Sequence, residues 1–180
     1  PYPINKGDKL RAYYQIKELA KSNEIHLISI TEKNIDQKAY NKLRKHCKSI
    51  NILYLSKLKI FTNLLKTFVN NKPFQVNYFY TSKIQQKINN IFDEVNPDHI
   101  YCQLIRTALY MKNQYKIKST LDYMDALSLG IKRRIKISNP FLKPILKIEY
   151  ERLVKFENLA FEFFNYHTII SKNDRDNIKH

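Results

Sequence analysis

The chain has 180 residues, of which 43% are hydrophobic, so it can bury a substantial core. This length favours a single folded domain, formed by residues 1–180, rather than two domains. Its apolar runs are far shorter than the ~20 residues of a membrane span, and no signal segment opens the chain, which predicts a soluble or peripheral protein. Cys47 and Cys102 have no metal-like spacing and indicate free thiols in a reducing compartment such as the cytoplasm.

The formal net charge of +16 would attract nucleic acid, anionic lipid or a phosphorylated substrate, and it does not choose among them. Lysine, asparagine and isoleucine are all heavily used, so base composition of the source genome is an alternative explanation for much of this charge. The charge therefore suggests classes of partner without deciding the function.

Segments with apolar residues at helical spacing alternate with apolar runs of strand length. Helices are predicted over 8–20, 36–47, 58–69, 82–95, 107–113 and 142–164. Strands are predicted over 24–30, 50–54, 99–102, 119–123 and 167–171. This alternation predicts an α/β fold, a Rossmann-like doubly wound parallel sheet with helices on both faces. Such sheets bind ligands beyond the carboxyl ends of their strands, so functional residues are expected just after strands.

The opening segment, 1–11, is a proline-bounded loop that runs into the amino terminus of the first predicted helix. Free backbone amides and the helix dipole make such a terminus an anion site. Gly7 would let the backbone approach a ligand closely, and Arg11 could add a bidentate contact to phosphate. A turn glycine followed by Asp8 as a helix cap explains the same two residues structurally.

A second candidate site follows the strand predicted at 119–123, where Asp122 and Asp125 could form a paired-carboxylate site. One of them would act as a general base if it lay within hydrogen-bond reach of an acceptor hydroxyl. The structural alternative is that Asp125 caps a helix beginning at Ala126 and Asp122 holds a neighbouring loop. The basic run 132–134 lies about two turns further on and can be a solvated face.

The segment 58–69 places five apolar side chains on one helical stripe with lysines around it. Such a basic amphipathic helix can lie on an anionic membrane surface, or it can pack on the sheet with its lysines in water. The aromatic residues of 73–80 suit a sugar or lipid groove, or the core.

Several motif searches give nothing. The chain has no Walker-type phosphate loop, no nucleophile-elbow serine, no HExxH and no Cys/His metal spacing, so no metal site is expected. Helix-turn-helix, zinc-finger and RNP signatures are absent too, and no nucleic-acid partner is expected. The five histidines form no usable pattern: His26, His46, His99, His167 and His180.

Taken together, these motifs resemble the amino-terminal domain of glycosyltransferase family 4, retaining enzymes of the GT-B fold that use nucleotide-sugar donors. The resemblance covers nearly the whole chain. It is carried by the Pro-Tyr-Pro-x-x-Lys-Gly-Asp-Lys-x-Arg opening, the strand at 24–27, the Asp-x-x-Asp-Ala-x-Ser turn at 122–128, Glu151-Arg152-Leu153 with Phe156-Glu157, and Ser171.

The resemblance implies a loop near the donor diphosphate and an acceptor cleft. The loop would contain Gly7, Asp8, Lys9 and Arg11, and the cleft would contain Asp122, Ser128, Arg133, Arg134 and Ser171. Asp125 is the catalytic candidate, although retaining GT-B enzymes generally lack an obvious protein nucleophile. Some members carry an acidic residue where this chain has Leu127. Any role that depends on a carboxylate at this position is therefore not assigned to this chain. The nucleotide sugar would be a substrate, and no cofactor is expected.

In this family a strand precedes the opening loop and occupies the middle of the sheet, and a donor-binding domain with a Glu-x7-Glu element follows. Since the chain runs from Pro1 to His180, the resemblance implies a domain that lacks both and is inactive alone. The leading function is transfer of a sugar to a polysaccharide or lipid-linked acceptor, either in the cytoplasm or peripherally at the inner face of the cell membrane. Two alternatives are a non-catalytic basic module that binds nucleic acid or anionic membrane, and a subunit that pairs with a separate donor domain.

Overall fold

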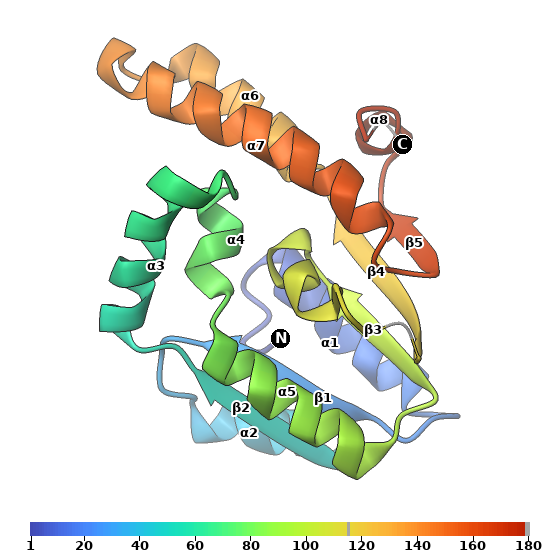
Figure 1. Ribbon diagram of the computed structural model, residues 1–180. Coiled ribbons are helices and arrows are strands. Elements are labelled where there is room, and N and C mark those ends of the chain that lie inside the picture. Colours follow the sequence, from blue (N-terminus) through green and yellow to red (C-terminus); the bar gives the residue numbers. More distant parts are fainter. Residues whose placement is uncertain (115, 179–180) are drawn as a thin grey trace. The chain divides into compact units, whose positions relative to one another are not determined.

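A computed structural model describes residues 1–114 and 116–178, and it has an α/β fold (Figure 1). The chain divides into two compact units, Pro1–Lys57 and Leu58–His180. Lys179 and His180, where the resemblance predicts a linker to begin, lie outside the described residues. No helix in the described ranges combines the length and the apolar character needed to cross a bilayer.

Unit 1 is built from two helix–strand pairs: α1 (Gly7–Leu19), β1 (His26–Thr31), α2 (Gln37–Arg44) and β2 (Ser49–Tyr54). The two strands are parallel and in continuous register from the pair His26 and Ser49 onward. Asp36 starts α2 because its carboxylate accepts a hydrogen bond from the Lys38 amide at 2.9 Å. These helices and strands match the predicted order.

Unit 2 contains the rest of the secondary structure. Its elements are α3 (Lys57–Asn70, which starts at the last residue of unit 1), α4 (Phe74–Phe79), α5 (Ser82–Val95), β3 (His99–Gln103), the 3₁₀ helix η1 (Ile105–Met111), β4 (Lys118–Met124), α6 (Leu127–Ile137), the 3₁₀ helix η2 (Pro140–Leu142), α7 (Lys143–Phe161), β5 (Tyr166–Ile169) and α8 (Lys172–Arg175). All strand pairs are parallel, in the order β3-β4-β5. The predicted α/β class and parallel strand direction are confirmed.

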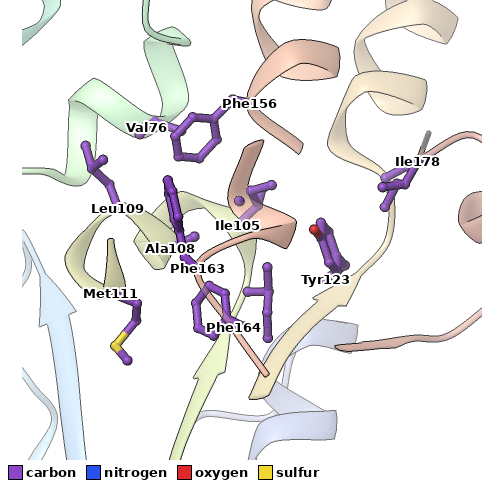
Figure 2. Packing of buried hydrophobic residues seen from close by; sticks show 13 residues of the cluster. Val76, Ile105, Ala108, Leu109, Met111, Tyr123, Phe156, Phe163, Phe164 and Ile178 are labelled. Carbon is purple, nitrogen blue, oxygen red and sulfur yellow. The ribbon is translucent and has the colours of Figure 1, made fainter. Parts of the chain in front are cut away.

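The core of unit 2 lies around β4, whose residues from Ser119 to Met124 are all buried. Figure 2 shows this core, in which side chains from β4, η1, α7 and the segment after α7 pack together, among them Ile105, Tyr123, Phe156 and Phe163. Helix α7 also packs along α6, and the two form a helical hairpin (Figure 1). The central strand is therefore held rigidly, and the loop that follows it starts from a fixed point.

Candidate functional site

The segment 122–128, called here the β4 turn, connects the central strand β4 to α6 at the carboxyl edge of the three-stranded sheet. Met124 has φ 63°, a left-handed backbone conformation that is rare for a residue with a side chain. The Asp125 amide donates to the Tyr123 carbonyl at 2.8 Å and tightens the bend. Leu104, at the end of the neighbouring strand β3, also has a positive φ, of 70°. Two strained residues thus lie where parallel sheets bind ligands.

Asp122 is fully buried at the end of β4. One carboxylate oxygen accepts from the Tyr101 hydroxyl at 2.7 Å, and the other accepts from the Met124 amide at 3.0 Å. Asp122 therefore fixes the strained bend and joins β4 to β3. Its side chain does not reach the surface of the described chain, and its place in an acceptor cleft stays a prediction.

Ser128 is buried as well, and its partner is Glu157 of α7. The Ser128 amide donates to Glu157 Oε1 at 3.0 Å, and the Leu127 amide and the Ser128 hydroxyl bond to the same carboxylate. Burial raises the pKa of Glu157, and these hydrogen bonds offset part of the rise. Glu157 therefore caps the amino terminus of α6 from another helix. The suggestion that Asp125 supplies this cap is wrong, because the cap position is Ala126 and has no side-chain bond.

Asp125 is exposed, and so are Arg133 and Arg134 on α6. Asp125 follows the central strand directly, and the turn that carries it is fixed on one side by Asp122 and on the other by Glu157. An exposed carboxylate on a rigid support can accept a hydrogen bond, or a proton, from a hydroxyl group of a bound molecule. Among the predicted residues of unit 2, Asp125 has the geometry best suited to chemistry.

Arg106 is a candidate that sequence reasoning missed. It follows β3 by three residues, in η1, and β3 ends beside β4 because Gln103 pairs with Asp122. The Arg106 Nε is buried, and no residue of the described chain accepts its hydrogen bond. Such an orphan donor is costly unless an ordered water or a ligand satisfies it. The sequence feature that could have identified Arg106 is its position as the single charged residue within the mostly apolar run 104–111.

Ser171 lies at the carboxyl end of β5, where it caps α8. Its hydroxyl oxygen accepts from the Asp174 amide at 3.0 Å and its proton is donated to the Asp174 carboxylate. The residue therefore has a structural role that explains its position without an acceptor.

In unit 1, the predicted diphosphate loop leads into α1 as expected, but Asp8 does not cap this helix. The cap position is Lys6, which makes no side-chain bond, and Asp8 lies in the first turn, where it accepts from the Lys9 amide at 2.9 Å. Lys9 Nζ turns back to Asn5 Oδ1 at 3.3 Å, and Arg11 is half-buried. A side chain at Gly7 would meet nothing within 4 Å, so packing does not require glycine there.

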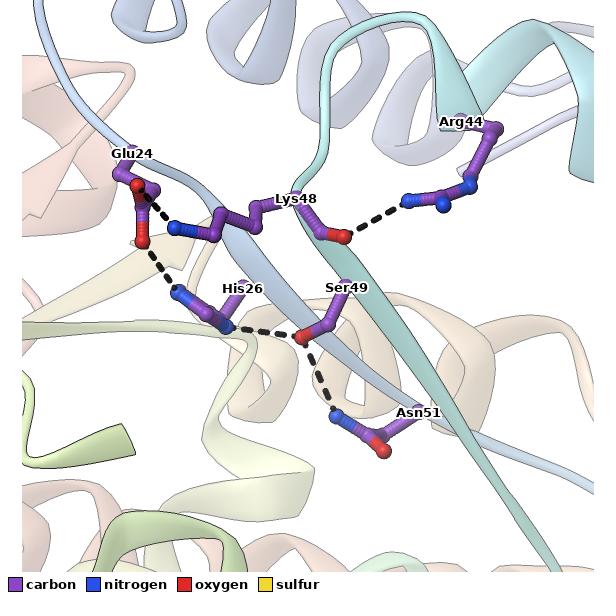
Figure 3. Close-up of polar contacts among 6 residues, drawn as sticks. All are labelled: Glu24, His26, Arg44, Lys48, Ser49 and Asn51. Carbon is purple, nitrogen blue, oxygen red and sulfur yellow. Dashed lines mark hydrogen bonds and ion pairs between the residues drawn. The ribbon is translucent and has the colours of Figure 1, made fainter. Parts of the chain in front are cut away.

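A polar network joins β1 to β2 (Figure 3). Glu24 contacts Lys48 at 2.7 Å and His26 Nε2 at 3.2 Å, and His26 Nδ1 lies 2.8 Å from the Ser49 hydroxyl. The hydrogen bond from Lys48, followed by that from His26, lowers the pKa of Glu24. The network links the beginnings of the two strands, and because the carboxylate is exposed it contributes little to stability.

Two shallow pockets stand out on the described surface, and none of the predicted site residues lines either of them. One lies in unit 1 against Lys17 and His46, and the other lies in unit 2 against Tyr123 and His167. Within 1–114 and 116–178, no group of three His, Cys, Asp or Glu side chains could hold a metal ion. The candidate site is therefore an exposed edge of the sheet, and a cavity does not define it.

Comparison of the chain with models of protein families, with curated proteins and with solved structures finds no match. The resemblance to glycosyltransferase family 4 thus stays a prediction from motifs. Any assignment of function depends on the residues and the geometry of the β4 turn and its surroundings.

Proposed function

We propose that the chain is the acceptor-side domain of a retaining GT-B glycosyltransferase, which moves a sugar from a nucleotide-sugar donor to a glycan or lipid-linked acceptor. The observation that carries this proposal is the position of Asp125. It is an exposed carboxylate at the carboxyl end of the central strand, on a turn held by two buried carboxylates, Asp122 and Glu157. In α/β sheets this edge is the usual place for a ligand.

The strand pattern supports the GT-B part of the proposal. A doubly wound sheet has the strand order 3-2-1-4-5-6, so its first strand separates a parallel pair from a parallel triplet. The described strands form a parallel pair, β1-β2, and a parallel triplet, β3-β4-β5. Each unit, taken by itself, therefore has the parallel strand pairing expected of part of a Rossmann-like sheet.

Each residue of the edge has a distinct chemical task in this proposal. Asp125 accepts a hydrogen bond from the acceptor hydroxyl and orients it. Arg106 is half-buried, and we assign its guanidinium a contact with an anionic oxygen of the substrate, for which a guanidinium is well suited. Arg133 and Arg134 add positive charge along α6 next to the same edge.

The test is sugar transfer by the product of the complete natural reading frame that contains this chain. Wild type is incubated with a panel of radiolabelled nucleotide sugars and with lipid and polysaccharide acceptors extracted from the source organism. We expect transfer from one donor, and we expect Asp125→Asn to reduce kcat about hundredfold or more, because a positioned acid–base group contributes at least this much. Asp93→Asn, at an exposed aspartate on α5, is the matched control and keeps the wild-type rate.

Two results would overturn the proposal. One is no transfer from any donor by a protein whose circular dichroism shows an intact fold. The other is a wild-type rate for Asp125→Asn, which would remove the site even if transfer occurred. Arg106→Lys tests the second residue, and we expect it to raise KM because a lysine cannot reproduce the planar, bidentate geometry of a guanidinium.

A further inference from the structure

Helix α3 has its apolar side turned outward. Five large apolar side chains of α3 are between 52% and 85% exposed: Leu58, Phe61, Leu65, Phe68 and Val69. At 3.6 residues per turn they lie within an arc of about 100°. The opposite side, which contains Ile60, Asn63 and Thr67, is buried. The expectation that the apolar stripe packs on the sheet is therefore wrong.

Polar contacts fix this orientation. Asn63 Nδ2 donates to the Tyr80 carbonyl at 2.6 Å, and Thr67 Oγ1 accepts from Asn77 Nδ2 at 2.9 Å. Arg152 of α7 donates to the Thr67 carbonyl at 2.7 Å. Rotating α3 to bury its apolar face would break these bonds and leave buried polar groups without partners. The outward apolar face is thus a consequence of the packing of unit 2.

A second apolar surface lies at the closed end of the α6–α7 hairpin. The side chains there are between 46% and 89% exposed: Ile137, Phe141, Leu142, Ile145 and Ile148. Figure 1 shows this end of the hairpin extending past the end of α3 that Arg152 holds. Further along α7, the Glu149 carboxylate accepts hydrogen bonds from the amides of Phe74 and Gln75 at 2.7 and 3.2 Å. These bonds anchor α7 to the segment that follows α3.

Both surfaces carry lysines and contain no acidic residue of their own. The sequence contains no Asp or Glu from 37 to 92 or from 126 to 148, and these stretches include α3 and the hairpin end. Lys59 and Lys66 border the apolar arc of α3 on one side, and both are exposed. The hairpin end adds Lys136, Lys143 and Lys147. Apolar side chains bordered by lysines match the interface of a bilayer with anionic head groups.

We propose that α3 and the hairpin end together dock unit 2 on the surface of an anionic lipid bilayer. The apolar side chains enter the boundary between head groups and acyl chains, and the lysines contact lipid phosphates. A protein partner would need an acidic rim around an apolar groove, whereas an anionic lipid surface needs only apolar side chains bordered by positive charge. This inference does not depend on sugar transfer, because binding to vesicles is measured without donor or acceptor.

The test is co-sedimentation of the 180-residue chain with vesicles of phosphatidylcholine alone or with 30% phosphatidylglycerol. We expect binding to the anionic vesicles and at least tenfold weaker binding to the neutral ones. The double variant Phe61→Ser/Phe68→Ser should bind anionic vesicles at least tenfold more weakly, because two apolar side chains no longer enter the interface. Phe141→Ser/Ile145→Ser tests the hairpin end in the same way. Leu159→Ser/Ile170→Ser removes two exposed apolar side chains outside both surfaces and should bind like wild type.

The chain contains no tryptophan, so a single Phe68→Trp substitution reports directly on insertion. We expect its emission to shift to shorter wavelength when anionic vesicles are added, and Tyr166→Trp, at another exposed site, to show no shift. The proposal is overturned if wild type stays in the supernatant with anionic vesicles, or if the α3 and control variants bind equally. It is also overturned if wild type is a dimer that Phe61→Ser/Phe68→Ser dissociates, since a second copy would then cover α3.

Discussion

Replacing Glu157 should show how far the β4 turn depends on a single buried carboxylate. Glu157→Leu keeps a side chain of similar size and removes the acceptor of the Ser128 and Leu127 amides, which lie at the buried amino terminus of α6. Each buried amide left without a partner costs about 1–3 kcal/mol. Burying the Glu157 carboxyl group is itself unfavourable, so its removal offsets part of this loss of stability. We expect a net loss of about 3 kcal/mol in the free energy of unfolding of unit 2.

Glu157→Gln separates the charge of this residue from its hydrogen bonds, because the amide oxygen can still accept. Burial raises the pKa of Glu157 above its ordinary value of 4.5, so the folded state holds the proton more tightly than the unfolded state does. The contribution of Glu157 to stability therefore falls as the pH rises from about 4.5 through the raised pKa. Wild type should lose stability relative to Glu157→Gln over this range.

Urea unfolding at several pH values between 4.5 and 8 measures this difference, with hydrogen exchange of peptides from 127–137 as a local probe of α6. Burial also raises the pKa of Glu149, but Glu149 is present in both proteins and its effect cancels. A difference between wild type and Glu157→Gln that does not change with pH would refute the argument from burial. A loss below about 0.5 kcal/mol in Glu157→Leu would show that the turn is held in another way.

Two further predictions concern buried groups of unit 2. Tyr110→Phe should lower the free energy of unfolding, measured by urea titration, by about 1–3 kcal/mol. The reason is that the Tyr110 hydroxyl donates to the Phe79 carbonyl at 2.6 Å and accepts from the Thr81 amide at 3.0 Å. An unchanged urea midpoint would contradict this prediction. Burial raises the pKa of the Cys102 thiol to about 11, so Cys102 should react with Ellman's reagent at pH 8 only after unfolding, and fast labelling of the folded chain would disprove its protected state.

The order of elements was predictable because it depends on local patterns. Helix α5 was predicted with its observed ends, since its boundaries are set by Thr81, whose hydroxyl accepts from the Ile84 amide, and by Asn96 in a left-handed conformation. The short segment 107–113 was predicted as a helix, and the structure has the 3₁₀ helix η1 two residues earlier, at Ile105–Met111. The last strand was predicted to reach Ser171 but ends at Ile169, because Ser171 starts α8.

The orientation of α3 and the capping of α6 were not predictable in the same way, because both depend on distant contacts. Periodicity identified the apolar stripe of α3, but its outward direction is decided by Asn77 and by Arg152, which is 85 residues from Thr67. The partner of Ser128 is likewise 29 residues away, on α7. A local cap by Asp125 was the natural expectation, and only the fold reveals that Glu157 takes this place and leaves Asp125 exposed.

The α6–α7 hairpin also sets a length. Helix α6 has 11 residues and begins two residues after Asp125, so at 1.5 Å per residue the helix places its far end about 16 Å along its axis from the turn that carries this carboxylate. If the hairpin end contacts a bilayer, Asp125 cannot be much farther than this from the head groups. A lipid-linked acceptor would then have to present its reactive hydroxyl within that height, which suits a short headgroup carrying one or two sugars better than a long, fully extended chain.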